Sequence, residues 1–247
     1  MNRTAIITGA AQGIGAEIAA TLTRKGYRVG IADIDSDKVE QTASLLEGST
    51  SLVCDVTSET AVTAAFDTFG AVPDLVVNNA GIVRFGPLAE QSVADFAQVV
   101  SVNLNAVYIV TREAVRRMQD RGSGHVISLT SINAYGPGPG AGAYPATKSA
   151  VKQLMRQFSL EYGEAGIRFN SIAPGFIDGG MSTPIYADPK VRALRSAGVP
   201  LGQLGKPSDI AEAVAFLDSE NGGYINGHDL VVDGGVTNSV LRNLPRD

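Results

Sequence analysis

Short apolar runs alternate with longer amphipathic runs along the whole chain. The short runs are rich in β-branched residues and apolar on both faces, which is typical of strands buried within a parallel sheet. They predict strands at 5–8, 28–32, 51–54, 75–77, 125–129, 168–172 and 229–232. The amphipathic runs have helical periodicity and predict helices at about 13–25, 36–47, 58–69, 92–120, 144–163 and 207–218.

This alternation predicts an α/β protein with a doubly wound Rossmann fold, in which a seven-stranded parallel sheet carries helices on both faces. We find no interdomain linker and no internal repeat, so a single nucleotide-binding domain over 1–247 is expected. The segment 175–200 is rich in Gly and Pro and is long for a loop of a compact domain. It is therefore expected to form a lid over the substrate.

Charge and apolar content narrow the possible partners. The net charge is −5, and the densest basic stretch, Arg116, Arg117 and Arg121, is too small to follow a phosphate backbone, so no nucleic-acid partner is expected. We see no signal peptide before the first strand, and no apolar run that approaches the ~18 residues of a membrane span. A cytoplasmic protein without a membrane partner is expected.

The residues that commonly bind metals are few. Cys54 is the single cysteine, lies in an apolar run and is expected to be a buried, unreactive thiol. His125 and His228 match no metal-ligand spacing, and structural or surface roles are expected for both. No metal site is predicted.

Glycines mark the junction between the first predicted strand and helix, in the sequence TGAAQGIG at 8–15. Gly9, Gly13 and Gly15 would let the backbone turn sharply and approach a pyrophosphate, which the free N–H groups at the helix N-terminus would bind. The spacing differs from the Gly-x-Gly-x-x-Gly pattern of other dinucleotide folds. With a strand before it and a helix after it, the loop predicts nucleotide binding.

An acidic residue, Asp33, ends the second predicted strand. A carboxylate at this position accepts hydrogen bonds from the 2′-hydroxyl of the adenosine ribose and repels a 2′-phosphate. No Arg or Lys follows Asp33 directly, and the glycine loop carries Gln12 where a phosphate-binding base would lie. NAD is therefore favoured over NADP.

Tyr144 and Lys148 are separated by one helical turn, so their side chains share one face of a predicted helix. That spacing alone is most often a packed tyrosine with a surface lysine. Ser131 changes the interpretation, because it follows the strand at 125–129, and the carboxyl ends of strands are where open α/β sheets bind ligands. A phenol acting as a base near neutral pH needs its pKa lowered by about three units, or roughly 4 kcal/mol, and a nearby ammonium favours that change.

A series of motifs, in order along nearly the whole chain, resembles those of the short-chain dehydrogenase/reductase family in its compact form. They are TGAAQGIG (8–15), NNAG (78–81), the asparagine of SVNLNA (Asn103), Ser131 with Tyr144 and Lys148, SIAPGFI (171–177) and GYINGHDLVVDGG (223–235).

The resemblance implies a hydride transfer between a nicotinamide cofactor and a substrate carbon. It makes Tyr144 the general base in alcohol oxidation and the general acid in ketone reduction, and Ser131 the residue that orients the substrate oxygen. It assigns to Lys148 the nicotinamide ribose hydroxyls and a lowering of the tyrosine pKa, and to Asn103 a water that links Lys148 to solvent. Asn133 lies in the segment that matches the family's substrate pocket, which makes Ser131, Asn133 and Tyr144 the expected substrate-binding residues.

The resemblance also implies which residues contact the cofactor. Asp55 and Val56 would contact adenine, the residues of 79–81 would line the adenosine ribose, and Ile177 would pack at the nicotinamide amide. The complete expected set is Gly9, Gln12, Gly13, Ile14, Gly15, Asp33, Asp55, Val56, Asn79, Ala80, Gly81, Tyr144, Lys148, Pro174, Gly175 and Ile177.

The chain departs from the family pattern at Gly179, where the family often has a threonine that bonds the cofactor. Either Ser182 or Thr183 could replace that threonine. Two further positions stay open: Tyr135 is either a pocket wall or a packing aromatic, and Arg84 either borders the substrate or is solvated.

These residues favour an NAD-dependent oxidoreductase acting on a secondary alcohol or ketone. The alternatives are an NADPH-dependent 3-ketoacyl-(acyl-carrier-protein) reductase, against which Asp33 argues, and a nucleotide-sensing protein without turnover. An enoyl reductase is disfavoured, because that branch of the family has a wider Tyr–Lys spacing. The apolar circumference of 92–120 resembles the dimer-forming helices of the family and implies a homotetramer or a dimer, although core packing would give the same pattern.

Overall fold

The computed structural model describes residues 3–239, so the ends of the predicted 1–247 domain lie outside the described residues. Within that range the strands form one parallel sheet with the order β3-β2-β1-β4-β5-β6-β7. The strands are β1 Thr4–Thr8, β2 Arg28–Asp33, β3 Thr50–Val53, β4 Leu75–Asn78, β5 Gly124–Leu129, β6 Ile167–Pro174 and β7 Asp229–Val232. The predicted doubly wound fold is confirmed.

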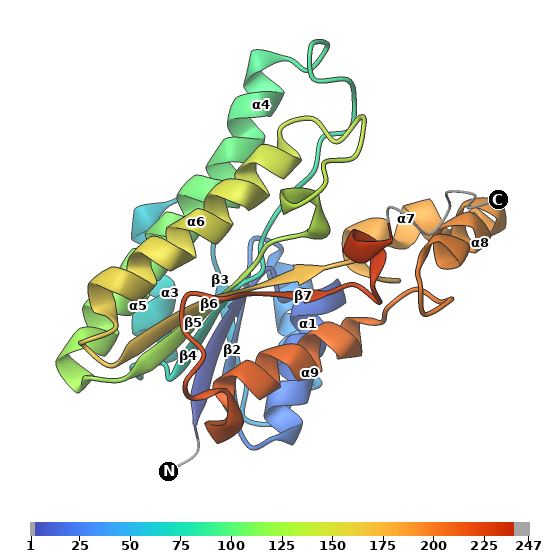
Figure 1. Cartoon of the computed structure of the whole chain (residues 1–247). Helices are drawn as coiled ribbons and strands as arrows, with labels where there is room; N and C mark the ends of the chain where they lie inside the picture. Colours follow the sequence, from blue (N-terminus) through green and yellow to red (C-terminus); the bar gives the residue numbers. More distant parts are fainter. Residues whose placement is uncertain (1–2, 240–247) are drawn as a thin grey trace.

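Helices cover both faces of the sheet (Figure 1). One face carries α3 (Glu59–Phe69), α5 (Ala106–Met118) and α6 (Tyr144–Tyr162), and the other carries α1 (Gly13–Arg24) and α9 (Pro207–Asp218). Each face encloses its own apolar core, the first around Phe66, Phe69 and Phe169 and the second around Ile7 and Leu22. Burial of these side chains holds the layers together.

Strands β1 and β4 lie side by side, and successive strands are added to the sheet in opposite directions from them, β2 and β3 on one side and β5 to β7 on the other. Helices α1 and α6 begin at the carboxyl edge of the sheet, close to this point. Open α/β sheets bind their ligands in the crevice outside the carboxyl ends at such a reversal. The fold thus defines the edge at which the predicted site residues are expected to meet.

The long helix predicted at 92–120 is interrupted. The structure has α4 (Val93–Val100), a π-helical turn (Ser101–Asn105), α5, and a short 3₁₀ turn (Gln119–Arg121). The π-helical turn adds a residue to one turn and so directs Asn103 into the protein, where its side chain is fully buried. Hydrophobic periodicity cannot distinguish this turn from a regular helix, because the apolar pattern continues through it.

The predicted lid is also more ordered than its composition indicates. It contains a 3₁₀ turn (Gly180–Ser182), α7 (Thr183–Tyr186) and α8 (Pro189–Gly198), which lie beyond the carboxyl end of β6 (Figure 1). Asp188 caps α8 by accepting a hydrogen bond from the backbone N–H of Lys190, and Pro189 occupies the first helical position. Asp-Pro is a standard helix start, and this signal could have identified α8 within the segment.

The prediction that no apolar stretch approaches the length of a membrane span is wrong for the run from Val93 to Arg121. Its most apolar window has a mean hydropathy of 1.4, which is enough for a span by length and composition. A core helix of a soluble protein passes the same test, so this run is weak evidence for a membrane. Only 28% of that window is buried within the chain.

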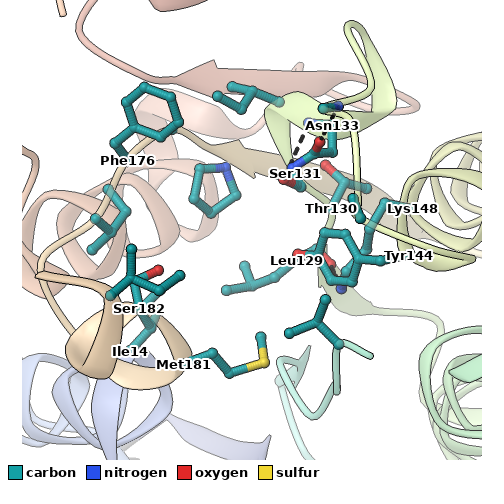
Figure 2. Close-up of a pocket in the computed structure, with 18 of the residues that line it drawn as sticks. Ile14, Leu129, Thr130, Ser131, Asn133, Tyr144, Lys148, Phe176, Met181 and Ser182 are labelled. Atoms are coloured by element: carbon teal, nitrogen blue, oxygen red, sulfur yellow. Dashed lines mark hydrogen bonds between the residues drawn. The ribbon is translucent and has the colours of Figure 1, made fainter. Parts of the chain in front are cut away.

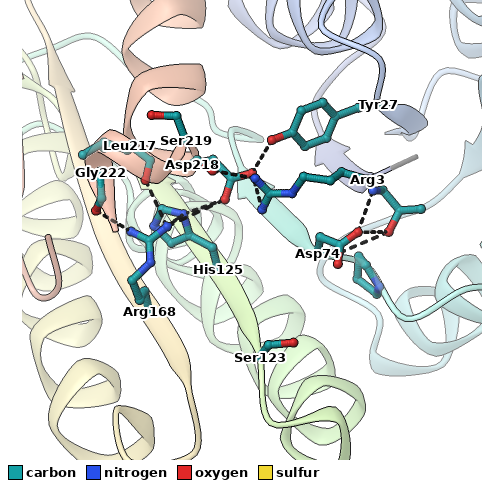
Figure 3. A network of polar contacts seen from close by, with 12 residues as sticks. Arg3, Tyr27, Asp74, Ser123, His125, Arg168, Leu217, Asp218, Ser219 and Gly222 are labelled. Atoms are coloured by element: carbon teal, nitrogen blue, oxygen red, sulfur yellow. Dashed lines mark hydrogen bonds and ion pairs between the residues drawn. The ribbon is translucent and has the colours of Figure 1, made fainter. Parts of the chain in front are cut away.

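A polar cluster centred on Asp218 joins the amino ends of several strands, at the edge opposite the predicted site (Figure 3). The fully buried Asp218 carboxylate accepts hydrogen bonds from Tyr27 at 2.7 Å and from His125 at 3.0 Å, and it pairs with Arg3 at 3.0 Å. Arg168 donates to the backbone oxygen of Leu217 at 3.0 Å. His125 is buried in this cluster, so its predicted structural role is confirmed.

Candidate active site

The glycine loop between β1 and α1 is too tightly packed for any larger residue at its glycines. A Cβ at Gly9 would lie 2.7 Å from the Ala80 Cα, and one at Gly15 would lie 2.3 Å from the Gly9 backbone oxygen. Gly9 and Gly13 also have φ values of 62° and 61°, which favour glycine. The loop therefore holds its backbone close to the neighbouring segment 79–81.

The N-terminus of α1 keeps its backbone donors available. The N-cap residue, Gln12, makes no side-chain capping hydrogen bond, whereas Asp35, Ser58 and Ser92 cap the helices that follow them. Unbonded N–H groups and the positive end of the helix dipole together favour a phosphate group at this position.

Asp33 lies at the end of β2, beside this loop. Its Oδ2 accepts a hydrogen bond from the backbone N–H of Ala11 at 3.2 Å, and its Oδ1 accepts one from Ile34 at 2.8 Å. Lys38, a cation close to Asp33, pairs instead with Asp35 at 2.7 Å. The carboxylate of Asp33 thus lies beside the loop without an ion pair of its own among the described residues.

The side chain of Asn79 ties the end of β4 to the glycine loop. Its amide donates to the backbone oxygens of Thr8 at 3.0 Å and Gly9 at 2.8 Å. The Thr8 hydroxyl in turn accepts from the backbone N–H groups of Asn79 and Ala80. These bonds place 79–81 alongside 8–15, as the cofactor-binding expectation requires.

Asn103 reaches the same region from the π-helical turn. Its side-chain oxygen accepts from the backbone N–H of Ile82 at 2.8 Å, and its nitrogen donates to the Ile82 oxygen at 2.8 Å. A Cβ on Gly81 would lie 3.3 Å from the Asn103 Oδ1 and 3.6 Å from the Lys148 Nζ, so Asn103 and Lys148 flank this glycine.

Ser131, Tyr144 and Lys148 meet at the carboxyl end of β5. The Lys148 ammonium is buried, donates to the backbone oxygen of Leu129 at 2.7 Å, and lies 5.5 Å from the centre of the Tyr144 ring. The Ser131 hydroxyl oxygen accepts from the backbone N–H of Asn133 at 3.1 Å, which leaves its proton free to donate. Figure 2 shows the three side chains on one side of a cavity.

The pKa directions differ from the expectation that Lys148 lowers the pKa of Tyr144. Burial raises the pKa of Tyr144 above its ordinary value, and the neighbouring Ser131 hydroxyl opposes this only in part. Burial also lowers the pKa of Lys148 to about 8, because the ammonium is removed from water without a carboxylate partner. As the structure stands, Tyr144 is therefore a protonated phenol and a proton donor.

The cavity has a volume of about 510 Å³, within the range usual for small-molecule sites. Its lining includes nine of the predicted site residues: Ile14, Asn79, Ser131, Asn133, Tyr144, Lys148, Pro174, Gly175 and Ile177. Other predicted residues lie around the glycine loop or beside Lys148 rather than in the lining: Gly9, Gln12, Gly13, Gly15, Asp33, Ala80, Gly81 and Asn103.

Two predicted adenine contacts lie outside the cavity. Asp55 is exposed, and its carboxylate accepts hydrogen bonds from the backbone and hydroxyl of Thr57. Val56 is buried in the apolar core on the side of α3. The backbone N–H of Cys54 donates to the Asp33 oxygen at 2.8 Å, which keeps this segment beside Asp33. Cys54 is buried, as expected, and burial raises the pKa of its thiol to about 11.

Several lining residues were not singled out from the sequence. They come mainly from the lid and are Met181, Ile185 and Tyr186, together with Thr130 and Val83. These residues are hard to identify from the sequence, because the apolar residues of the lid are few and do not recur with the spacing of a helix or a strand. Ser182 lines the cavity opposite Tyr144 (Figure 2), whereas Thr183 does not line it, so the structure favours Ser182 over Thr183.

Gly179 has a structural reason to lack a side chain. A Cβ there would lie 2.7 Å from the Cγ of Pro207, at the start of α9. The threonine that the family often has at this position would not fit this packing. Tyr135 lies outside the lining and donates to the Asp229 carboxylate at 2.8 Å, which is a packing role.

Comparisons with known proteins agree with this geometry. A family model described as enoyl-(acyl carrier protein) reductase matches residues 9–237. The chain is 35% identical over 246 residues to 3β-hydroxysteroid dehydrogenase 1 of Eggerthella lenta, covering 95% of this chain and 94% of that protein. It is 36% identical over 244 residues to the 3-oxoacyl-(acyl-carrier-protein) reductase of Chlamydia trachomatis, covering 96% and 98%.

A solved structure is equally similar. The 3-oxoacyl-(acyl-carrier-protein) reductase of Brucella melitensis, crystallised with NAD, superimposes with a TM-score of 0.89 at 31% identity, covering 95% of this chain and 91% of that one. Its similarity and that of the two relatives extend over nearly the whole chain, glycine loop, cavity and lid included. This chain is a member of the short-chain dehydrogenase/reductase family of oxidoreductases.

Proposed function

We propose that the protein is an NAD-dependent oxidoreductase that interconverts a secondary alcohol and a ketone, with Tyr144 as the general acid and base. The observation that carries this proposal is that Ser131, Tyr144 and Lys148 line one largely apolar cavity of about 510 Å³. Proton donors that converge on one point in an apolar cavity suit a substrate with a single reacting oxygen.

The residues around the glycine loop fit a dinucleotide. The tightly packed glycine loop and the uncapped N-terminus of α1 together offer a backbone cradle for a pyrophosphate. Asp33 would contact the adenosine ribose, and Lys148 would contact the nicotinamide ribose. The bound cofactor supplies the hydride donor or acceptor.

The preference for NAD rests on Asp33. Its carboxylate would bond the 2′-hydroxyl of NAD and repel the 2′-phosphate of NADP. The neighbouring cation, Lys38, is already paired with Asp35.

Ser131 and Tyr144 carry the proton chemistry. The free Ser131 hydroxyl proton would bond the substrate oxygen and orient it toward the phenol. Tyr144, protonated as the structure stands, would donate its proton to a developing alkoxide in ketone reduction. In alcohol oxidation it must first lose that proton, and two positive charges favour this: that of Lys148 and that of an oxidised nicotinamide.

Asn103 positions the backbone beside Lys148. Because both polar atoms of its side chain bond Ile82, the water proposed to link Lys148 to solvent would be held by a backbone oxygen of the π-helical turn. Insertions of this kind free backbone groups and are frequent at functional sites.

The test combines the protein with NAD⁺ and a panel of secondary alcohols, and with NADH or NADPH and a panel of ketones, while absorbance at the NADH wavelength is followed. Turnover that strongly prefers NADPH would overturn the assignment of the cofactor. It would favour the second candidate, a 3-ketoacyl-(acyl-carrier-protein) reductase, which the Chlamydia and Brucella relatives suggest. Cofactor binding without any turnover would instead favour a nucleotide sensor.

We also propose a homotetramer or dimer. The surface of the described chain exposes large apolar side chains on two sides, including Val93 on α4, Leu160 on α6 and Tyr224 before β7. Such positions are typical of surfaces covered by another copy. The cytoplasmic location stays a prediction from the sequence.

A further inference from the structure

Arg195 projects from α8 into the lining of the cavity. It and Lys148 are the charged residues of that lining, which contains no Asp or Glu from the described part of the chain. Lys148 bonds the Leu129 backbone and belongs to the catalytic group. The proposed reaction therefore assigns no role to the positive charge of Arg195 at the cavity.

Two aromatic rings hold the guanidinium of Arg195. Its Cζ lies 4.9 Å from the centre of the Phe176 ring and 5.9 Å from that of the buried Tyr186. Stacking on ring faces orients a guanidinium and leaves its N–H donors available at the edge. Within residues 3–239 none of these donors makes a hydrogen bond or an ion pair.

Arg192 provides the contrast. It lies one helical turn before Arg195 on α8, is more exposed, and pairs with the carboxylate of Asp178. Asp178 is in the lid, outside the cavity lining. The helix thus carries one arginine neutralised by the lid itself and another that faces the cavity without an anion.

The walls of the cavity strengthen any charge interaction inside it. Much of the lining is apolar, with Val83, Phe85, Ile132 and Ile185 among its members. A low dielectric increases the attraction between opposite charges, and a planar guanidinium binds a planar carboxylate through two parallel hydrogen bonds. The single positive charge of the Arg195 guanidinium would be neutralised by one carboxylate of a ligand.

We propose that Arg195 is a specificity-determining residue that binds a carboxylate of the substrate, so that the preferred substrates are hydroxycarboxylic acids and the corresponding keto acids. This inference rests on the proposed function and narrows its substrate class. Arg195 takes no part in the proton transfer; it fixes the end of the substrate remote from Ser131 and Tyr144.

The experiment compares hydroxycarboxylic acids with their methyl esters, which keep the carbinol and lose the charge. Wild-type protein is expected to oxidise the best acid with a kcat/KM about 10- to 100-fold above that of its ester. Arg195→Met should remove this preference, mainly through a higher KM for the acid, with a much smaller change for the ester. Arg195→Lys should retain part of it. Arg192→Met, the matched control, should retain all of it.

Two measurements separate this inference from its alternatives. The Kd of NADH, followed by its fluorescence, should be the same for wild type and Arg195→Met; an increase would show that Arg195 binds the cofactor and would overturn the inference. Binding of a non-reacting carboxylic acid to the protein–NADH complex, followed by ligand-observed NMR, should be lost in Arg195→Met.

The remaining outcomes are equally distinct. Equal rates on acids and esters, or turnover of neutral alcohols only, would overturn the role of Arg195 and leave the proposed oxidoreductase intact. Absence of turnover on the whole panel would overturn the proposed function. Carboxylate binding by NMR would then still decide whether Arg195 is an anion site.

Discussion

The carboxylate of Asp33 accepts a hydrogen bond from the backbone N–H of Ala11 at 3.2 Å, which joins the acidic end of β2 to the glycine loop. Replacing Asp33 by Ala should raise the KM for NAD about 10- to 100-fold and lower that for NADP, because one charged acceptor and one repulsion disappear together. Steady-state kinetics with both cofactors measures this. Glu40→Ala, which removes an exposed carboxylate of α2, should leave the preference unchanged.

Tyr144→Phe should reduce kcat by about 10²- to 10⁴-fold, because it removes the proton donor from the cavity and little else. Binding of NADH should persist, as measured by fluorescence. Tyr135→Phe is the control, since that hydroxyl bonds Asp229 outside the cavity lining. Wild-type turnover by the Tyr144 variant would exclude the proposed mechanism.

His125 should make the fold less stable in mild acid. Burial lowers the pKa of His125, with Arg168 and Arg3 acting in the same direction and Asp218 opposing them. The folded protein therefore keeps the imidazole neutral, whereas the unfolded chain protonates it below about pH 6.5. The stabilisation is present above that pH and is lost as the pH falls below it toward the folded-state pKa.

The neutral tautomer follows from the neighbours of His125. Asn170 donates to Nε2 at 3.0 Å and the Asp218 carboxylate lies 3.0 Å from Nδ1, so these two partners favour the proton on Nδ1, which also has Arg168 at 3.1 Å. Urea unfolding at pH 7.5 and pH 5.5 measures the effect. His125→Gln should weaken the pH dependence relative to wild type, and His228→Gln should leave it unchanged; equal slopes for His125→Gln and wild type would contradict the assignment.

Gly15→Ala should weaken both cofactor binding and stability. The new methyl group would lie 2.3 Å from the Gly9 oxygen and 2.5 Å from the Asn79 side chain, so the loop must move. Overpacking of this kind costs about 1–3 kcal/mol of unfolding free energy. Gly198→Ala at the end of α8 meets no atom within 4 Å and serves as control. Calorimetry with and without NADH reports both effects.

Association should bury the exposed apolar side chains. Light scattering coupled to size exclusion should give the mass of a tetramer or a dimer rather than the 25.7 kDa of one chain. Val93→Glu on α4 and Tyr224→Glu before β7 introduce charges at two separate exposed sites, so each should weaken a different interface. A monomer at micromolar concentration would contradict this expectation.

The strands and their parallel arrangement could be predicted from the sequence, because buried parallel strands are short and apolar on both faces. The meeting of Ser131, Tyr144 and Lys148 at one cavity could be predicted because they are near one another in the chain and occupy motif positions. The π-helical turn was missed, since Asn103 is drawn inward by its bonds to Ile82, a contact between distant segments. Hydrophobic periodicity does not carry such information.

The pKa directions of Tyr144 and Lys148 could not be predicted from their spacing for a related reason. Spacing places the two residues on one face of α6, but it does not say how deeply each is buried. Burial sets both pKa directions in the structure and outweighs their proximity. No role could be assigned to Arg195 from the sequence, because its contacts with Phe176 and Tyr186 depend on the fold of α7 and α8.

The cluster around Asp218 and the cavity beneath α8 occupy opposite edges of the same sheet. The residues that fasten the strands together are consequently not those that choose the substrate. In such a chain, substitutions in α7 and α8, including the loss of Arg195 or the gain of another cation, leave the edge of the sheet that carries the Asp218 cluster unchanged. Substrate choice is thus free to diverge among descendants of such a protein with little loss of folded stability.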